Sequence, residues 1–370
     1  MNNKICVYAI CKNESQFVEK WLASMCEADY IVVLDTGSED NTFELLKNDP
    51  RVYRVEQKVI NPWRFDVARN ESMKLIPDDA NILVCTDLDE VLESGWADVL
   101  RKKWIDDVHT RAIYKYAWSH HDNGEPARIF QYDKIHTKDW VWNFPVHECL
   151  VHKDDILNVN YQLENTLNVF NEVYLHHYPD PTKSRSSYLP LLELRKQENP
   201  TDHFGKIYLS HEYYYRGYYQ KAIDELQEIL TKYSDKYSDL EKASCYLFMG
   251  DAYRAMGDYP SCIASYQKAI LVDDTYREPY ANLAEVLNER KYFNQAIGVI
   301  KDCLAKTYRH YTWLERDDTW TYKLYDILSV AYYWIGDFDN ALSNIHKAIH
   351  YCPNDERILN NLKLIENKLF

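Results

Sequence analysis

The sequence predicts an α/β domain over residues 1–180 and an all-α array of repeated helical pairs over residues 203–370. Short apolar runs alternate with helical stretches in the first part, and helical segments recur at a near-constant interval in the second. The chain also holds 32 tyrosines against 9 glycines, which suits packed helices better than a turn-rich all-β fold. Residues 181–202 contain three prolines and are predicted to connect the two parts.

The overall composition excludes several classes of protein. A net charge of −15 argues against a nucleic-acid-binding protein and against docking on anionic lipid. No apolar run approaches the ~20 residues of a transmembrane helix, and the N-terminus lacks a signal-peptide pattern. The 9 cysteines are scattered without paired C-x-x-C motifs. We therefore expect a cytoplasmic protein with reduced thiols and no structural zinc site.

The first part alternates predicted strands and helices. This pattern predicts a parallel sheet with helices on both faces, whose ligands bind beyond the carboxyl ends of the strands. Residues 110–180 are predicted to form the more irregular half of the same domain, with a loop around residues 122–124. The predicted strands are Ile5–Ile10, Tyr30–Leu34, Val52–Val55, Asn81–Cys85, Arg111–Trp118 and Ala127–Tyr132, and the predicted helices are Ser15–Glu27, Asn41–Lys47, Asp66–Leu75 and Tyr188–Lys196.

The second part is predicted to contain four helical pairs: Phe204–Leu230, Lys242–Val272, Glu278–Leu304 and Tyr322–Tyr351. The second helix of each pair carries a small residue where a neighbouring helix must approach closely. These residues are Ala222, Cys262, Ala296 and Ala341, at intervals of 40, 34 and 45 residues. An interval of 34 residues is the period of tetratricopeptide repeats, which this pattern resembles; the longer intervals indicate insertions in loops.

Two aspartates follow the predicted strand Asn81–Cys85. Residues two apart on an extended chain point to the same side, so Asp87 and Asp89 are expected to converge at the sheet edge. Paired carboxylates form a hard-oxygen site suited to Mn²⁺ or Mg²⁺, which can bind a nucleotide diphosphate. The alternative is a solvated turn at the end of a strand.

Three further polar segments follow or flank predicted strands at this edge. Asn13 and Glu14 follow the first strand, where they can meet a base or ribose or else cap the next helix. Asp35 follows the second strand and can accept a hydrogen bond from a base imide. Arg69 can pair with a carboxylate or a phosphate, or lie on a helix surface.

Four motifs occur in order: CKNES, IVVLDTGSEDNT, FDVARN and CTDLDEVL. Together they resemble family-2 glycosyltransferases of the GT-A fold over roughly residues 4–180. Within that family, the chain is most similar to bacterial peptide S-glycosyltransferases that carry helical repeats, while lipopolysaccharide-core glucosyltransferases share its N-terminal motifs. The resemblance implies a GT-A-type nucleotide-sugar transferase domain followed by a tetratricopeptide superhelix. It also implies inverting transfer from a nucleotide-diphosphate donor, with UDP the expected nucleotide.

The resemblance also assigns roles to residues. Asp89 is the expected metal ligand and His147 the additional one, with His120, His121, His136 and His152 as alternatives. Asp87 contacts ribose or metal, and Glu148 is the candidate general base. His176 corresponds to a histidine of a later family segment that precedes basic residues. The expected donor-binding residues are Ala9, Cys11, Asn13, Glu14, Asp35, Arg69, Asp87 and Leu88.

The identity of the acceptor is left open by the sequence. Tetratricopeptide arrays present concave surfaces that hold extended peptides, which favours a peptide or protein acceptor presented by the repeats. The same repeats can instead mediate a homodimer. The wider family favours a cell-surface glycan or a lipopolysaccharide-type acceptor. A different class of function is an adaptor, in which the first domain binds nucleotide but lacks activity.

Overall fold

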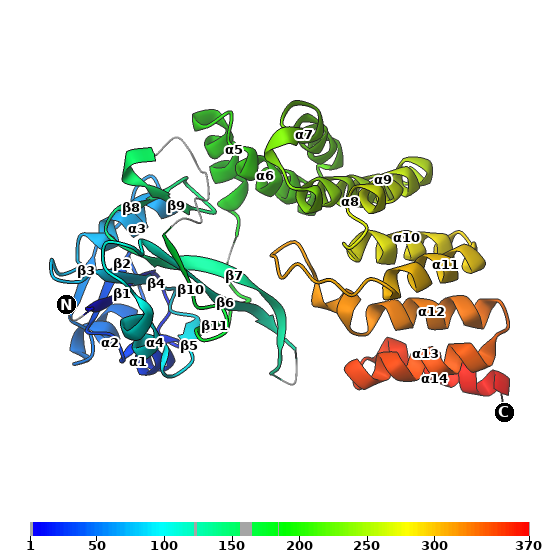
Figure 1. Ribbon diagram of the computed structural model, residues 1–370, viewed down its shortest axis with the longest axis horizontal. Helices are drawn as coiled ribbons and strands as arrows, with labels where there is room; N and C mark the ends of the chain where they lie inside the picture. The colour runs from blue at the N-terminus through cyan, green and yellow to red at the C-terminus, as the bar shows by residue number, and fades with distance from the viewer. Residues whose placement is uncertain (1–2, 122–123, 156–164, 184, 370) are drawn as a thin grey trace. The chain divides into compact units, whose positions relative to one another are not determined.

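The computed structural model describes residues 3–121, 124–155, 165–183 and 185–369, and part of the loop predicted at residues 122–124 lies outside them. The chain divides into two compact units, Met1–Pro200 and Thr201–Phe370. The first contains a mixed sheet and the second is all helical in the residues described (Figure 1). The segment predicted as a connection contains the helix α5 (Tyr188–Glu198), which belongs to the first unit.

The first unit begins with the predicted alternation of strands and helices. Each predicted element up to residue 85 is present, although the third strand begins two residues later than predicted. The elements are β1 (Ile5–Cys11), α1 (Val18–Met25), β2 (Tyr30–Asp35), α2 (Thr42–Asn48), β3 (Arg54–Gln57), α3 (Phe65–Met73), β4 (Ile82–Cys85), β5 (Glu90–Leu92), α4 (Trp96–Lys103), β6 (Arg111–His120), β7 (Pro126–His136), β8 (Trp140–Asn143), β9 (Cys149–His152), a 3-10 turn (Lys153–Asp155), β10 (Thr166–Asn168) and β11 (Tyr174–His177).

The main sheet has the strand order β3-β2-β1-β4-β7-β6-β11-β5, with β10 paired to β6. The first four strands are parallel, as predicted. The prediction of a wholly parallel sheet is wrong, because β7 runs antiparallel to both β4 and β6. The physical reason is the short connection between β6 and β7, which closes a hairpin and leaves no room for a crossover helix. Strands β8 and β9 form a separate antiparallel pair.

Strand β1 lies in the middle of the parallel half and is buried along its whole length. An uninterrupted apolar strand is typical of a sheet covered on both faces. Helix α3 packs against β1 and β2, and α1 buries Trp21, Leu22 and Met25. The Trp21 indole donates a hydrogen bond to Thr86 Oγ1 at 3.0 Å, which fixes α1 beside the end of β4.

The strand register places three loops at one edge of the sheet. Cys11 at the end of β1 is paired with Asp35 at the end of β2. Cys85 at the end of β4 is paired with Tyr8 of β1, and Thr86 N donates to the Tyr8 carbonyl oxygen at 3.2 Å. The segments that follow β1, β2 and β4 therefore leave the sheet at neighbouring positions, as parallel strands require.

The second unit contains the four predicted helical pairs and a further helix that the sequence analysis missed. The two helices of each pair contact each other. None of the helices in the described residues has the length and apolar character needed to cross a membrane. The helices are α6 (His203–Tyr215), α7 (Tyr219–Lys232), α8 (Asp239–Met256), α9 (Tyr259–Val272), α10 (Glu278–Glu289), α11 (Phe293–Leu304), α12 (Lys323–Trp334), α13 (Phe338–Tyr351) and α14 (Glu356–Leu369), with 3-10 turns at Ser234–Lys236 and Asp317–Trp320.

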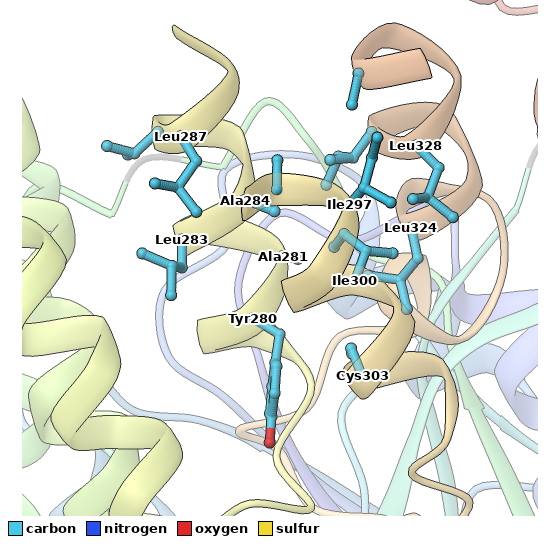
Figure 2. Packing of buried hydrophobic residues seen from close by; sticks show 14 of the residues in the cluster. Tyr280, Ala281, Leu283, Ala284, Leu287, Ile297, Ile300, Cys303, Leu324 and Leu328 are labelled. Atoms are coloured by element: carbon cyan, nitrogen blue, oxygen red, sulfur yellow. The ribbon is translucent and has the colours of Figure 1, made fainter. Parts of the chain in front are cut away.

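Small residues allow the close helix packing of this unit. The four small residues identified in the sequence, Ala222, Cys262, Ala296 and Ala341, are fully buried. Gly250 of α8 faces the ring of Tyr266 on α9, and a Cβ atom at Gly250 would lie 2.4 Å from that ring. Figure 2 shows the resulting core between α10, α11 and α12, where Ile297, Ile300 and Leu324 meet.

Candidate functional site

The loops that follow β1 and β2 are joined by hydrogen bonds. Asn13 has a left-handed backbone with φ of 54°. Its Oδ1 accepts hydrogen bonds from the backbone N–H groups of Glu39 (2.7 Å) and Asp40 (3.4 Å), and its own N–H donates to Ser38 Oγ at 2.9 Å. The next helix begins at Val18, so Asn13 does not act as its cap. Asn13 instead holds the two loops in register at the sheet edge.

Asp35 is fully buried at the end of β2. Its Oδ1 accepts hydrogen bonds from Gly37 N (2.9 Å), Ser38 N (2.8 Å) and Gln57 Nε2 (3.0 Å). Although burial works against it, these hydrogen bonds lower the pKa of Asp35. Its Oδ2 lies 3.6 Å from the Cys11 thiol sulfur. Asp35 is therefore an ionised carboxylate that organises the loop after β2.

Arg69 is buried at the centre of a charged cluster. Its Nε donates to Glu148 Oε1 at 2.5 Å, and its Nη2 lies 3.0 Å from Asp87 Oδ1. Its Nη1 lies 3.2 Å from the sulfur of Cys85, and its guanidinium carbon lies 5.1 Å from the centroid of the Trp142 ring. Arg69 is thus an internal pairing residue and not a surface arginine. It joins the end of β4 to the segment between β8 and β9.

Asp87 also faces Lys134 of β7, at 3.4 Å from the lysine nitrogen. Although burial works in the opposite direction, Arg69 and Lys134 hold the pKa of Asp87 well below its usual value. The Asp87 N–H donates to Glu90 Oε2 at 2.9 Å, and the Tyr116 hydroxyl donates to Glu90 Oε1 at 2.9 Å. Burial raises the pKa of Glu90 against the opposing effect of Lys134.

Lys134, Glu90 and Tyr116 were missed by the sequence analysis. Glu90 lies within the motif CTDLDEVL, three residues after Asp87. This short distance is the feature of the sequence from which its contact with Asp87 could have been predicted. Tyr116 lies in the predicted strand Arg111–Trp118, and Lys134 lies two residues beyond the predicted strand Ala127–Tyr132. The pairing of these strands was not predicted. No sequence pattern links Lys134 to Asp87, because the pairing of β4 with β7 brings the two residues together.

Asp89 is buried and contacts a histidine of β11. The His177 Nε2 lies 3.4 Å from Asp89 Oδ2, and the backbone N–H of Tyr178 donates to the Asp89 carbonyl oxygen at 2.8 Å. The His177 Nδ1 is 3.0 Å from the carbonyl oxygen of Trp118, which can only accept, so Nδ1 carries a proton. Although burial works in the opposite direction, the hydrogen bond with Asp89 raises the pKa of His177.

The histidines named from the sequence lie in other environments. The His147 ring packs edge-on against Tyr188, with 5.6 Å between centroids. Burial, together with the positive charges of Arg195 and Arg185, lowers the pKa of His147 to about 3, which favours its neutral form. The His176 Nδ1 is 3.0 Å from His120 Nε2 and its Nε2 is 2.9 Å from Glu93 Oε1.

The three remaining candidates also have partners away from the aspartates. His136 is buried with its Nε2 2.5 Å from the Tyr8 hydroxyl oxygen, and its Nδ1 is 2.7 Å from the carbonyl oxygen of Thr137. The His152 Nδ1 lies 3.7 Å from Asp154. His121 donates its backbone N–H to Glu125 in the turn of the β6–β7 hairpin. His177, one residue from the predicted His176, is the histidine that contacts Asp89.

Glu14 is buried and forms an ion pair with Lys183. Burial raises the pKa of Glu14 to about 7; Lys183 opposes this shift, and the charges of Asp89 and Asp87 add to it. Lys183, in the segment after β11, therefore adds a positive charge beside Glu14 and near Asp87 and Asp89. Carboxylate oxygens are the ligands that hard divalent cations prefer in proteins.

Three of the predicted donor-binding residues contribute little side-chain surface. Ala9 is fully buried in β1, Cys11 is buried at its end, and Leu88 is buried between the two aspartates. The backbone at the end of β1 is also engaged, because the Cys11 carbonyl oxygen accepts hydrogen bonds from the backbone N–H and the hydroxyl of Thr36.

The arrangement offers a partial metal site. In the described part of the chain, no three histidine, cysteine, aspartate or glutamate side chains are arranged to hold a metal ion. Asp89 Oδ2 and His177 Nε2 do lie 3.4 Å apart, a separation that fits two ligands at about 2.0–2.2 Å from one ion. In neutral His177 the Nε2 carries the lone pair, since Nδ1–H is held by Trp118. These two side chains therefore have the separation of two ligands of one divalent cation.

No protein-family model and no curated protein matches the chain. Solved tetratricopeptide-repeat structures are among those that match. A thermophilic TPR protein of Thermus thermophilus is 19% identical, with 49% of this chain and 88% of that chain covered and a TM-score of 0.36. The C-terminal part of a TPR repeat-containing protein from Cytophaga hutchinsonii is 16% identical, with 50% of this chain and 66% of that chain covered and a TM-score of 0.41. The MamA protein is 18% identical, with 44% of this chain and 80% of that chain covered and a TM-score of 0.35.

Proposed function

We propose that the first unit transfers a sugar from a nucleotide-diphosphate donor, with UDP the expected nucleotide, to an acceptor with inversion at the anomeric carbon. The observation that carries this proposal is the contact of Asp89 with His177 beside Asp87. It lies at the edge where the loops after β1 and β2 emerge, which is where open α/β sheets bind ligands. The four motifs that resemble family-2 glycosyltransferases surround this same edge.

In this proposal Asp89 and His177 hold Mn²⁺ or Mg²⁺, and Asp87 faces the ribose or the metal. His177 takes the place expected for His147, because His177 contacts Asp89 and its Nδ1–H is fixed by Trp118. An imidazole ligand favours Mn²⁺ over the harder Mg²⁺. When bound, the cation neutralises charge on the departing diphosphate. Lys183 faces the same region and adds positive charge there.

The contacts of Glu148 change its proposed role. Its carboxylate accepts a charge-assisted hydrogen bond from Arg69, so this oxygen is directed at the guanidinium and not at an incoming acceptor. We therefore propose Glu148 as a positioning residue that holds Arg69 against Asp87. An acceptor with a thiol nucleophile would need little help from a base, because its pKa is low compared with that of an alcohol.

The acceptor is proposed to be a peptide or protein, presented by the helical unit. A cell-surface glycan or a lipopolysaccharide-type acceptor is the alternative from the same enzyme class. The two proposals predict different products from one experiment. The chain is incubated with UDP-sugars and Mn²⁺, and transfer is measured to a cysteine-containing peptide and to a lipopolysaccharide core. Product on the peptide alone supports the first proposal.

The metal assignment is tested by Asp89→Asn, with Asp98→Asn on α4 as a matched control. The Asp98 side chain is 90% exposed and lies outside the four motifs, so its loss should leave activity unchanged. We expect Asp89→Asn to lower Mn²⁺-dependent release of UDP from a UDP-sugar by about 100-fold or more, since charge stabilisation of the leaving group is lost. Unchanged release in Asp89→Asn would contradict the assignment. UDP binding by calorimetry without turnover on any acceptor would favour the nucleotide-binding adaptor.

A further inference from the structure

The segment between α11 and α12 is longer than a regular repeat requires (orange in Figure 1). Ala296 and Ala341 occupy equivalent positions 45 residues apart, which exceeds the tetratricopeptide period of 34 by 11 residues. We call residues 305–322 the insert. It contains one short 3-10 turn, Asp317–Trp320, and otherwise lacks regular structure. Loops of this length without regular structure are uncommon and are usually functional.

Arg277, just before α10, binds both ends of the insert. Its Nη1 donates to the Thr319 carbonyl oxygen at 3.2 Å, and its Nε donates to the Lys306 carbonyl oxygen at 3.2 Å. The ring of Trp320 lies 3.7 Å from the guanidinium carbon. Because one guanidinium binds both carbonyl groups, residues 306 and 319 lie close together. The residues between them form a loop that leaves the array and returns to almost the same place.

The middle of the insert reaches the first helical pair. Trp313 stacks on Tyr208 of α6 with 5.1 Å between centroids and an interplanar angle of 25°, and it lies 5.9 Å from the His211 ring. The His211 ring in turn stacks on Phe248 of α8 at 3.6 Å. We call Tyr208, His211 and Phe248 the aromatic cluster. Trp313 therefore inserts its indole against side chains that are about 100 residues away in sequence.

The aromatic cluster belongs to the layer formed by the first helices of the pairs. Within this layer α6 contacts α8, α10 contacts α12, and α12 contacts α14. In stacked helical pairs, a layer of this kind is a surface on which extended peptides bind. The insert occupies part of that surface in the way an extended peptide would, with a tryptophan as its anchor.

Backbone contacts hold the insert along the segment before α10. The Tyr276 hydroxyl donates to the Leu314 carbonyl oxygen at 3.2 Å, and Thr275 Oγ1 lies 2.8 Å from His310 Nε2. The backbone N–H of Arg316 donates to the Glu278 carboxylate. Leu314 is buried and belongs to the core of the unit, whereas Trp313 is partly buried against it. Backbone hydrogen bonds together with an aromatic anchor are the usual contacts of a bound peptide.

We propose that residues 308–318 are an intramolecular ligand of the helical unit, and that they cover a binding surface for a tryptophan-containing polypeptide. A partner reaches the aromatic cluster by displacing Trp313. Because the insert is tethered at both ends, it competes at the high effective concentration of an intramolecular segment. The insert therefore restricts access to this surface to partners that provide a comparable aromatic anchor. This proposal does not rest on sugar transfer by the first unit.

The test removes residues 308–318 from the full chain, which restores a 34-residue interval between Ala296 and Ala341. The ligand is a fluorescein-labelled synthetic peptide of residues 306–320, with its Trp313→Ala form as the control, and binding is measured by fluorescence anisotropy. We expect the peptide to bind the shortened chain at least about 10-fold more tightly than the intact chain, and the Ala peptide to bind about 10-fold more weakly than the tryptophan form. Equal affinity for both chains, or no binding to the folded shortened chain, would overturn the proposal.

A second variant keeps the proposal testable if the shortened chain does not fold. Trp313→Ala in the full chain should release the insert, so trypsin should cleave after Arg309 and Arg316 at least about 10-fold faster while the far-ultraviolet circular dichroism stays unchanged. Trp334→Ala, at a tryptophan of α12 that is 63% exposed, is the control and should not accelerate this cleavage. Loss of helical structure in Trp313→Ala without selective cleavage would show that the insert is an inseparable part of the core, and the proposal would fail. UDP-sugar turnover affects neither readout.

Discussion

At the scale of single residues, the two aspartates of the Asp87-Leu88-Asp89 triplet differ in their partners. Asp87 is held between Arg69 and Lys134, and these charges keep it ionised. Asp89 instead contacts His177, a residue from the last strand of the unit. A carboxylate already neutralised by two cations is a weaker cation ligand than one beside an imidazole. The difference supports Asp89 as the principal metal ligand and Asp87 as a residue that faces the nucleotide.

The proposed role of His177 predicts a specific loss of metal affinity. We expect His177→Gln to weaken Mn²⁺ binding in the presence of UDP by about 10- to 100-fold, as is usual when a ligand or its supporting partner is lost. His176→Gln is the matched control, because His176 is the neighbouring residue and contacts His120 and Glu93. Isothermal titration calorimetry provides both affinities. If His147→Gln shows the loss and His177→Gln does not, the original assignment of His147 is correct.

At the scale of elements, the helical pairs depend on a few close approaches between helices. Gly250 marks the closest of these in α8, since the ring of Tyr266 on α9 fills the space that a side chain would need. The Tyr266 hydroxyl also donates to Asp251 Oδ1 at 2.6 Å, and Asn282 of α10 donates to the same oxygen at 2.8 Å. One polar contact thus joins three successive helices, and the glycine permits it.

We expect Gly250→Ala to destabilise the helical unit by about 1–3 kcal/mol, because the added methyl group overpacks a filled contact. The methyl carbon would lie 2.4 Å from Tyr266 unless the helices move apart. Gly298→Ala on α11 is the control, since no atom lies within 4 Å of its added Cβ. That change should stabilise the helix by up to about 1 kcal/mol through helix propensity. Urea unfolding of both variants measures the two effects, and equal stabilities would contradict the prediction.

At the scale of the whole molecule, each unit has its own core. Residues of β1, β2, β4 and α3 form one cluster of buried side chains in the first unit. Two other clusters fill the second unit, one at α6–α8 and one that extends from α8 to α14. Separate cores of this size allow the two units to unfold independently.

Calorimetric unfolding of the full chain should therefore show two transitions. UDP with Mn²⁺, each at about 100 times its dissociation constant, should stabilise the transition of the first unit by about 2.7 kcal/mol. The transition of the helical unit should not move. Asp89→Asn serves as the control, because it should abolish the shift that UDP with Mn²⁺ produces in the first transition. A shift of both transitions together would contradict independent unfolding.

The sequence by itself determined the elements whose pattern is local. Hydrophobic periodicity and small residues at repeat spacing located the four helical pairs, and alternating runs located the strands and helices up to Cys85. The same reasoning identified Asp35, Arg69, Asp87 and Asp89 as residues at one edge, because parallel strands end together. The α14 helix was missed since it lies beyond the last complete repeat.

The tertiary structure alone decided which side chains surround those aspartates. Lys134 and His177 come from β7 and β11, which are about 45 and 90 residues after Asp87 in sequence. Their positions depend on the antiparallel pairing of β7 with β4 and on the register of β11 with β5. A shift of one residue in a strand reverses every side chain, so His177 faces Asp89 while His176 faces the other side of the sheet. Register is set by the packing of the whole sheet, and no local pattern in the sequence specifies it.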